Sequence, residues 1–445
     1  MTSKLSLPRS KLLSARTLTF LDLTLIVSLI FFLFREIWLG SGFRSGHDAL
    51  NGFIRFLYHY RHGWLTTWYY YDQGGFVEPY FNTSAEIFLL RFLSWLMKDP
   101  FGLYTTYVFL LTVFGPIGMY LFSKKHNNSN VAALFSALVY GFNPVYIQIT
   151  IDAAQAIYLA PYAAFPWILL LWDRAVERGD GLSMVGASIL TSTYLISYYP
   201  PAAPYVQAIF GFFLIAYMIY RIAFAANRKL MIHRSIFTTV LSLVLSIPSF
   251  TMYRYFSYSA FVQSIQTSGS RHPLPAISRL SQSPLSALLL LLPTIIVTPQ
   301  KYPRWDITGP EVFLFTIVPV LSLSLIFFKS KRRDAVFYMS TLVISLFLSM
   351  GPNSTLSSLF VKLYYGIPYF TTMASLYRYS LITSFAYSIL SGSTFGMIAH
   401  KFTRNKIYSI GLLYLIMASF FNLYSFPHLE LGAASRYAPP PEYTR

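Results

Sequence analysis

The chain has 445 residues, of which 55% are hydrophobic and only 11% are charged, less than half of the roughly 25% charged residues that are typical of soluble domains. Long apolar runs recur from end to end, and continuous runs of this kind predict membrane-spanning helices, because lipid cannot satisfy backbone polar groups. The absence of cysteine excludes disulfides, cysteine nucleophiles and cysteine metal ligands. In such a chain the 34 basic against 16 acidic residues report membrane orientation, so we expect membrane lipids and no nucleic acid as partners.

The apolar runs predict an all-α, polytopic transmembrane bundle of about 11–13 helices. No small-residue cleavage site follows the first run, which we interpret as an uncleaved signal-anchor. The predicted spans lie near Leu18–Leu39, Gly102–Phe122, Val131–Ile147, Ala153–Trp172, Leu182–Tyr199, Tyr205–Phe224, Ser235–Tyr253, Pro310–Phe328, Ala335–Met350, Ser375–Ala399 and Ile407–Phe426. Of two shorter apolar segments, we predict Ser84–Met97 to be an interfacial helix, whereas Pro284–Thr298 is either re-entrant or a short span.

The distribution of basic residues predicts which segments face the cytoplasm. The inner segments would be Met1–Thr17, Ser123–Asn130, Asp173–Gly181, Arg221–Arg234, Lys329–Asp334 and His400–Lys406. They contain 4, 2, 2, 4, 4 and 3 basic residues, 19 of the 34 in the chain, as the positive-inside rule requires. If Ser84–Met97 spanned the membrane, Ser123–Asn130 would fall outside, so the interfacial interpretation is favoured.

This pattern predicts a multi-pass cell-membrane protein with a cytoplasmic N-terminus and an extracytoplasmic C-terminus. Residues 1–426 would form one membrane domain, with its first outer loop over residues 40–99, and residues 427–445 an extracytoplasmic tail. The longer outer segments are Gly40–Asp99, Arg254–Pro310 and Gly351–Ala374.

The first outer loop holds the most informative residues. His47 and Asp48 come shortly after the first span, and an aromatic-basic run containing Trp68 follows. Tryptophan and tyrosine at this density mark the lipid headgroup level, so we expect the loop to lie on the membrane as short helices, with a turn at Asp72–Gly75.

A second acid, Asp152, lies in the short outer turn between the third and fourth spans. Two carboxylates that converge at the membrane surface can hold a divalent cation, such as Mg²⁺ or Mn²⁺, or share acid–base work. The alternative is that Asp48 only caps a helix, a common role for aspartate. Acids near membrane depth are costly and are candidates for function.

The order of these motifs resembles the GT-C superfamily of membrane glycosyltransferases, which use polyprenyl-phosphate-linked sugars. The resemblance is closest to the large prokaryotic and archaeal branch. It rests on Asp48 after the first span, Gly118–Lys125 (GMYLFSKK), the aromatic-Asn-Pro sequence of Phe142–Pro144, and then Asp152; Ser375–Tyr379 (SLYRY) resembles an arginine-containing segment that begins a late span. The resemblance implies a GT-C-like bundle with a partly helical first extracytoplasmic loop.

The resemblance also implies roles for individual residues. Asp48 would be the essential acid that activates the acceptor or ligates the metal, and Asp152 would be its partner. His47 stands where the family often has a further acid, and no DxD-like second motif surrounds Asp152, so metal dependence is left open.

A lipid phosphate requires cations, and arginine forks fit phosphate oxygens. The site would bind its substrate through residues of the outer segments and their boundaries, namely Arg378, Arg279, Arg271, Tyr377 and Trp68. For most outer cations the alternative is a solvated loop charge or a headgroup anchor.

The expected function is therefore transfer of a sugar from a dolichyl- or undecaprenyl-type phosphate to a hydroxyl of a glycan, lipid or protein acceptor on the extracytoplasmic face. One alternative is a transporter or a lipid or glycolipid flippase, for which inverted repeats and mid-span ionisable residues would be typical. Another is a non-catalytic scaffold for envelope assembly.

Overall fold

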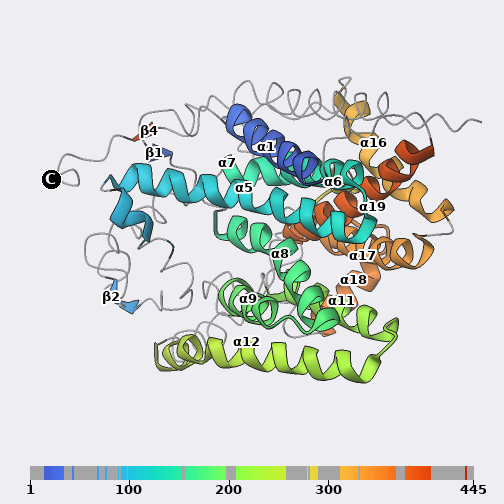
Figure 1. Ribbon diagram of the computed structural model, residues 1–445. Helices are drawn as coiled ribbons and strands as arrows, with labels where there is room; N and C mark the ends of the chain where they lie inside the picture. Colours follow the sequence, from blue (N-terminus) through green and yellow to red (C-terminus); the bar gives the residue numbers. More distant parts are fainter. Residues whose placement is uncertain are drawn as a thin grey trace, which may run out of the picture.

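The computed structural model of the protein is a bundle of packed helices (Figure 1). It describes residues 15–34, 43–44, 68–69, 76–77, 89, 92–97, 99–151, 156–196, 207–256, 278, 281–288, 311–328, 331–366, 376–401 and 436–437. The early helices are α1 (Ala15–Leu33), α5 (Pro100–Asn127), α6 (Asn130–Phe142), α7 (Pro144–Ile151), α8 (Ala156–Arg178) and α9 (Gly181–Thr191), which continues as the π-helical η4 (Ser192–Ile196). The later ones are η5 (Gln207–Gly211), α11 (Phe212–Ala223), α12 (Arg228–Phe256), α15 (Pro284–Leu288), α16 (Glu311–Ser324), η6 (Leu325–Phe327), α17 (Arg332–Met350), η8 (Gly351–Asn353), α18 (Ser357–Gly366), η10 (Leu376–Tyr379) and α19 (Ser380–Lys401).

Each predicted span from the first to Ser375–Ala399 corresponds to a helix or to consecutive helical segments, whereas Ile407–Phe426 lies outside the described residues. By length and composition, four helical stretches of the described chain are long and apolar enough to cross a membrane: Thr105–Asn127, Arg228–Ile247, Arg332–Asn353 and Leu376–Lys401. Shorter apolar helices accompany them. The all-helical bundle is thus confirmed, and its helices are compatible with a membrane protein.

The segments predicted to be outer loops contain structure that the sequence did not predict. In the first of them, β2 (Trp68–Tyr69) pairs antiparallel with β3 (Phe76–Val77) where short helices were expected, and the turn expected at Asp72–Gly75 lies outside the described residues. Residues 92–96 are helical, within the predicted interfacial segment. Another strand pair, β1 (Phe43–Arg44) with β4 (Arg436–Tyr437), places the start of this loop beside the C-terminal tail.

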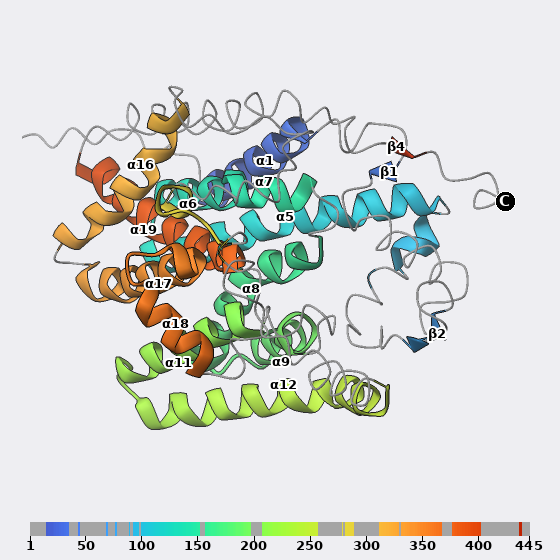
Figure 2. The ribbon, with the colours of Figure 1, turned by 180° about the vertical axis from the view of Figure 1, so that it is seen from behind.

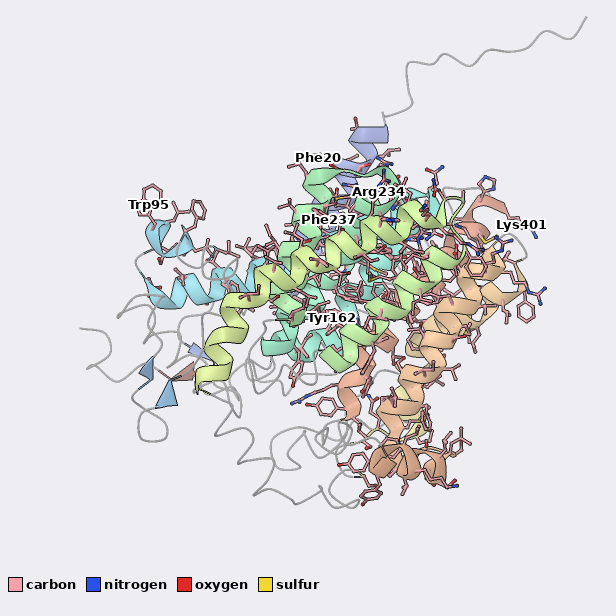
Figure 3. The ribbon with its side chains drawn as sticks, turned by 90° about the horizontal axis from the view of Figure 1, so that it is seen from below. Phe20, Trp95, Tyr162, Arg234, Phe237 and Lys401 are labelled. Carbon is pink, nitrogen blue, oxygen red and sulfur yellow. The ribbon has the colours of Figure 1, made fainter. Side chains whose placement is uncertain are left out.

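Polar and apolar side chains are distributed on α12 in the reverse of the soluble pattern. Figures 1 and 2 show α12 along the edge of the bundle, next to α9 and α11. Its buried side chains are small hydroxyls, such as Thr238 and Ser246, whereas Phe237 and Val240 are at least half exposed. Figure 3 looks onto α12, which crosses the near side of the bundle and carries Phe237. Small polar residues between helices and large apolar residues outside are expected of a bundle surrounded by lipid.

Helices α6 and α19 pack closely against each other. A methyl group added at Gly392 would lie 2.8 Å from the Ala132 carbonyl oxygen, and one at Gly396 would lie 2.6 Å from the Ala132 Cβ atom. The glycine pair (Gly392–Gly396) has the G-x-x-x-G spacing, which places both residues on one helix face and lets two backbones approach closely. Aromatic side chains also join these two helices, since the rings of Phe135 and Phe395 stack with centroids 4.4 Å apart.

The ends of several helices bring basic residues to one end of the bundle, here called the basic end. It comprises the C-terminal ends of α5, α8, α11 and α19 and the N-terminal ends of α6, α12 and α17. Contacts between helices confirm that these ends meet: Lys331 Nζ donates to the His126 carbonyl oxygen over 2.7 Å, and Arg234 donates to the Val176 carbonyl oxygen over 2.9 Å. The segments predicted to face one side of the membrane, as far as the structure describes them, thus lie together. The opposite end, here called the α7 end, contains α7, the start of α8 and η10.

Candidate functional site

At the α7 end, Asn143 divides what the sequence predicted as one span into α6 and α7. Its backbone is extended (φ −76°, ψ 155°), and Pro144 begins the next helix. The Asn143 side-chain nitrogen donates to the carbonyl oxygens of Val139 (3.1 Å) and Tyr140 (2.7 Å), while its oxygen accepts the backbone N–H of Tyr146 (2.9 Å). One amide thereby satisfies unpaired groups at the end of one helix and the start of the next. The Asn-Pro pair of this motif therefore ends α6 and begins α7 without leaving these backbone groups unpaired.

Two tyrosine hydroxyls replace backbone hydrogen bonds that prolines remove. A proline lacks the N–H that would reach the carbonyl four residues earlier. Tyr146 donates to the Thr112 carbonyl, which Pro116 leaves unpaired in α5. Tyr140 donates over 2.6 Å to the Tyr162 carbonyl, which Pro166 leaves unpaired in α8. The carbonyls freed inside the bundle are therefore satisfied by side chains from α6 and α7, as lipid-embedded helices require.

The late chain folds back on this region through Tyr162 and α19. The rings of Tyr140 and Tyr162 stack with centroids 4.1 Å apart, and the Tyr162 hydroxyl shares a 2.6 Å hydrogen bond with the Ser384 hydroxyl. Ser384 lies in the second turn of α19, and it is fully buried. Helices that are far apart in sequence are thus held in register at the α7 end.

Arg378 precedes α19 and lies against the start of α8. Its guanidinium carbon is 4.3 Å from the centroid of the Tyr158 ring and 5.7 Å from that of Tyr377. Tyr158 is in the first turn of α8, six positions after Asp152, and only 2% exposed. A cation held over an aromatic face is stabilised electrostatically and loses little freedom on binding an anion.

The predicted site is only partly within the described residues. Arg378 and Tyr377 lie at the α7 end as above, and Trp68 is described as a backbone position in β2. The remaining predicted residues, Asp48, His47, Asp152, Arg271 and Arg279, lie outside the described residues. In the part of the chain that the structure describes, no group of three or more His, Asp or Glu side chains is placed to hold a metal ion. The prediction of a divalent cation at Asp48 and Asp152 therefore stays a prediction.

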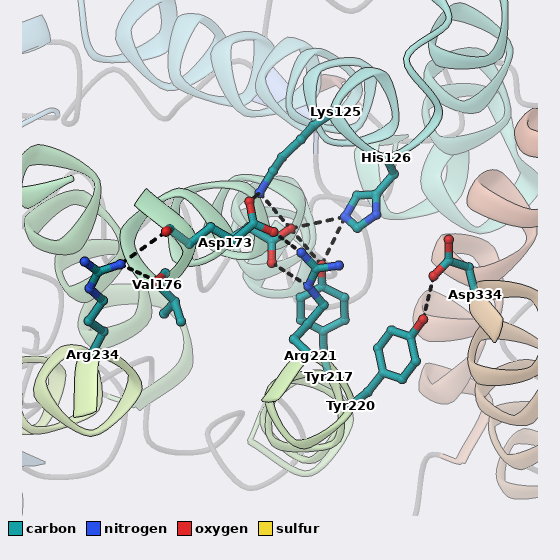
Figure 4. Close-up of polar contacts among 10 residues, drawn as sticks. Lys125, His126, Asp173, Val176, Tyr217, Tyr220, Arg221, Arg234 and Asp334 are labelled. Atoms are coloured by element: carbon teal, nitrogen blue, oxygen red, sulfur yellow. Dashed lines mark hydrogen bonds and ion pairs between the residues drawn. The ribbon is translucent and has the colours of Figure 1, made fainter. Parts of the chain in front are cut away.

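A second polar centre lies at the basic end, around the fully buried carboxylate of Asp173 (Figure 4). One carboxylate oxygen is 3.1 Å from Lys125 Nζ, 3.2 Å from His126 Nε2 and 2.9 Å from the donating Tyr217 hydroxyl; the other is 3.2 Å from Arg221 Nε. Glu177, one turn further along α8, pairs with both Lys125 and Arg221. Cations from α5 and α11 thus hold two acids of α8 between them.

These neighbours determine the ionisation of Asp173, which lies one residue beyond the predicted end of its span. Burial alone would raise the pKa of the carboxyl group. The hydrogen bond with His126 and the positive charges around it outweigh burial and lower the pKa from 3.8 to about 2. The carboxylate is therefore charged at neutral pH and acts as the hub of an ion-paired network.

Two features of these centres were missed from the sequence. Asp22 is buried within α1 and accepts a 2.7 Å hydrogen bond from the Tyr120 hydroxyl; an acid inside the first apolar run was the available signal. Tyr158 was not singled out, because nothing local in the sequence distinguishes it from other aromatic residues of the spans.

Chemically, the α7 end holds the Arg378 guanidinium against two buried tyrosine rings, and such a guanidinium is suited to pairing with an anionic group. The basic end offers a charge network whose acids are already neutralised by neighbours. No protein-family model matches the chain. A search of curated proteins likewise finds no match.

Proposed function

We propose that the protein is a membrane glycosyltransferase with a GT-C-like arrangement, transferring a sugar from a polyprenyl phosphate to an acceptor hydroxyl. One observation carries the proposal: Arg378, from the late part of the chain, stacks on Tyr158, which follows Asp152 by six positions in the sequence. A cation from η10 and the start of α8, which directly follows the acidic segment in the sequence, thus belong to the same end of the bundle. A lipid-linked donor requires this combination at one membrane face.

In the proposed reaction the acceptor O–H loses its proton to Asp48 while its oxygen attacks the anomeric carbon of the sugar. The bond from that carbon to the phosphate oxygen breaks, and the phosphate leaves with the electron pair and inverts the anomeric configuration. Arg378 balances the charge of the leaving phosphate, and Arg279 and Arg271 are further candidates from the neighbouring outer segment. Asp152 would support Asp48, and these two carboxylates would be the residues to hold Mg²⁺ or Mn²⁺ if the reaction uses a divalent cation.

In the proposed orientation the basic end faces the cytoplasm, and the α7 end faces outward. The arrangement of charges supports this, because the predicted cytoplasmic segments meet at the basic end. The donor lipid would then enter from the outer leaflet, and its phosphate would lie at the level of η10.

A transporter or flippase is the competing function, and the break between α6 and α7 is the feature that favours it, since transporters bind substrates at broken helices. Here, however, Asn143 satisfies both helix ends internally. The break is accordingly a packed feature of the core, which supports the enzyme over the transporter.

The deciding experiment uses the purified full-length chain in detergent and a panel of polyprenyl-phosphate sugars with acceptor alcohols. We expect Asp48→Asn to abolish transfer, because general-base help contributes about 10²–10⁴-fold. Arg378→Lys should raise the donor KM although the charge is kept, since lysine cannot make a bidentate contact. Lys362→Gln, an exposed change on α18, is the matched control and should leave transfer unaltered. Full activity of Asp48→Asn would refute the mechanism, and donor movement across vesicles without transfer would favour the flippase.

A further inference from the structure

At one corner of the basic end, the end of α11 meets the start of α17. The Tyr220 hydroxyl donates to Asp334 over 2.5 Å, and its ring stacks on Phe337 with centroids 4.4 Å apart. Beside this contact, the Arg333 guanidinium carbon lies 5.5 Å above the ring of Phe224. We call this region the α11–α17 corner and define it by Phe224, Arg332 and Arg333.

The corner presents positive charge outward. Arg332 and Arg333 are exposed, as are Arg228 and Lys229 at the start of α12, which follows α11 after a short connection. Three acids described at this end already have partners: Asp173 is fully buried among cations, Glu177 pairs with Lys125 and Arg221, and Asp334 accepts from Tyr220. The outward surface of the corner is therefore electropositive.

The positions of these cations are unfavourable for the helices themselves. A helix dipole favours cations at its C-terminal end, where α5 has Lys124 and Lys125, and disfavours them at its N-terminal end. Both α12 and α17 nevertheless begin with two basic residues; α17 also has Asp334 in its first turn, whereas the first turn of α12 has no acid. A bound anion would offset this repulsion.

Apolar surface borders the same cations. Phe224 is 60% exposed, Ile219 on α11 is 63% exposed and Phe327, just before α17, is 83% exposed. A soluble anion or a nucleic acid gains nothing from such neighbours. A phospholipid matches both parts, with its phosphate at the arginines and its acyl chains along the phenylalanines and Ile219.

We propose that the α11–α17 corner binds the phosphate headgroup of an anionic phospholipid. The proposal is independent of the glycosyltransferase reaction and requires only that the bundle lies in a membrane. Positive charge in inner segments is sufficient to orient a membrane protein, but orientation alone does not require a lipid to bind at this corner in preference to others.

The test measures lipid binding to the purified full-length chain in neutral detergent by native mass spectrometry, with thermal unfolding as a second readout. The probes are dioleoyl phosphatidylglycerol and dioleoyl phosphatidylcholine. We expect the anionic lipid to bind more tightly and to raise the unfolding temperature. The double variant Arg332→Gln/Arg333→Gln should weaken its binding by about 30-fold, which corresponds to about 1 kcal/mol for each basic residue.

Two variants control for charge and folding. Lys362→Gln removes one exposed cation from α18, outside the corner, and should keep the preference for the anionic lipid. Arg332→Lys/Arg333→Lys retains the charge and should bind nearly as well as the native chain. Equal binding of the two lipids, or the same loss in Lys362→Gln, would overturn the proposal. Equal stabilisation by heparin or inorganic phosphate would also overturn it, and would assign the corner to soluble anions.

Discussion

Replacing Tyr146 with phenylalanine removes one oxygen atom from the core and leaves the ring in place. The hydroxyl donates to the Thr112 carbonyl, whose normal helical partner is missing because Pro116 has no N–H. Tyr146 and Thr112 are both fully buried, so water cannot substitute for the lost donor. An unsatisfied buried carbonyl costs about 1–3 kcal/mol, and we expect Tyr146→Phe to lower the free energy of unfolding by this amount.

The structure supplies a rescue that tests the cause. In a Pro116→Ala background the new N–H at position 116 can donate to the Thr112 carbonyl and restore the helical bond. Pro116→Ala has its own cost, because the proline ring packs against Gly141. Tyr146→Phe should nevertheless be nearly neutral in this background, which would give a coupling energy of about 1–2 kcal/mol in the double-mutant cycle.

Unfolding of the four proteins would be measured by denaturant titration in mixed micelles. Tyr338→Phe is the matched control, because the Tyr338 hydroxyl is buried without a hydrogen-bond partner among the described residues. Its loss should be neutral or slightly stabilising. If Tyr146→Phe were equally destabilising with Pro116 and with Ala at that position, the hydroxyl would not be compensating for the proline, and the reasoning would fail.

Three further predictions concern packing, pH and topology. Gly392→Ala should lower the unfolding temperature, because the added methyl group would collide with α6. Gly211→Ala should leave the unfolding temperature unchanged, because nothing lies within 4 Å of the added methyl group. An equal change of the unfolding temperature in both variants would refute the close contact between α6 and α19. Asp173 has a pKa lowered to about 2 from 3.8, so the stability that it contributes is complete above about pH 4 and is lost as the pH falls through 2. Asp173→Asn should therefore be less stable at pH 7 and show a flatter profile between pH 4 and 2 in thermal unfolding, while an unchanged profile would contradict this pKa. Cysteine labels at Asp180 and Asp72 should be accessible from opposite sides of the membrane, with Asp180 cytoplasmic, and labelling of both from one side would overturn the proposed topology.

The predicted spans agree well with the helices because an apolar run of sufficient length has few other stable conformations in lipid. The boundaries differ where local capping decides them. Helix α5 begins at Pro100, two residues before the predicted start, since Asp99 accepts the Gly102 N–H over 2.8 Å and caps the helix. The helix α18 was missed, because ten residues in an outer segment are too short for a span and resemble a loop.

The polar contacts between helices were beyond sequence reasoning. The partners Tyr162 and Ser384 are 222 positions apart, and Asp22 and Tyr120 are 98 apart. Each of these residue types also occurs many times in the chain, so composition and spacing cannot specify which ones pair. The same holds for the expected site. Arg378 was predicted from the sequence, but its aromatic partner Tyr158 is identified only by the packing of η10 against α8.

The two acids of α8 also bear on the order in which the helices can assemble during synthesis. Chains are made from the N-terminus, so α5 and Lys125 exist before Asp173 and Glu177 are inserted. The acids can pair with this lysine as soon as α8 packs on α5, so that neither carboxylate is left without a cation. Arg221 arrives later, on α11, and completes the network from the other side. The packed pair of α5 and α8 thus already presents the two carboxylates with which Arg221 pairs. This charge pairing favours one position for α11 when it joins the bundle.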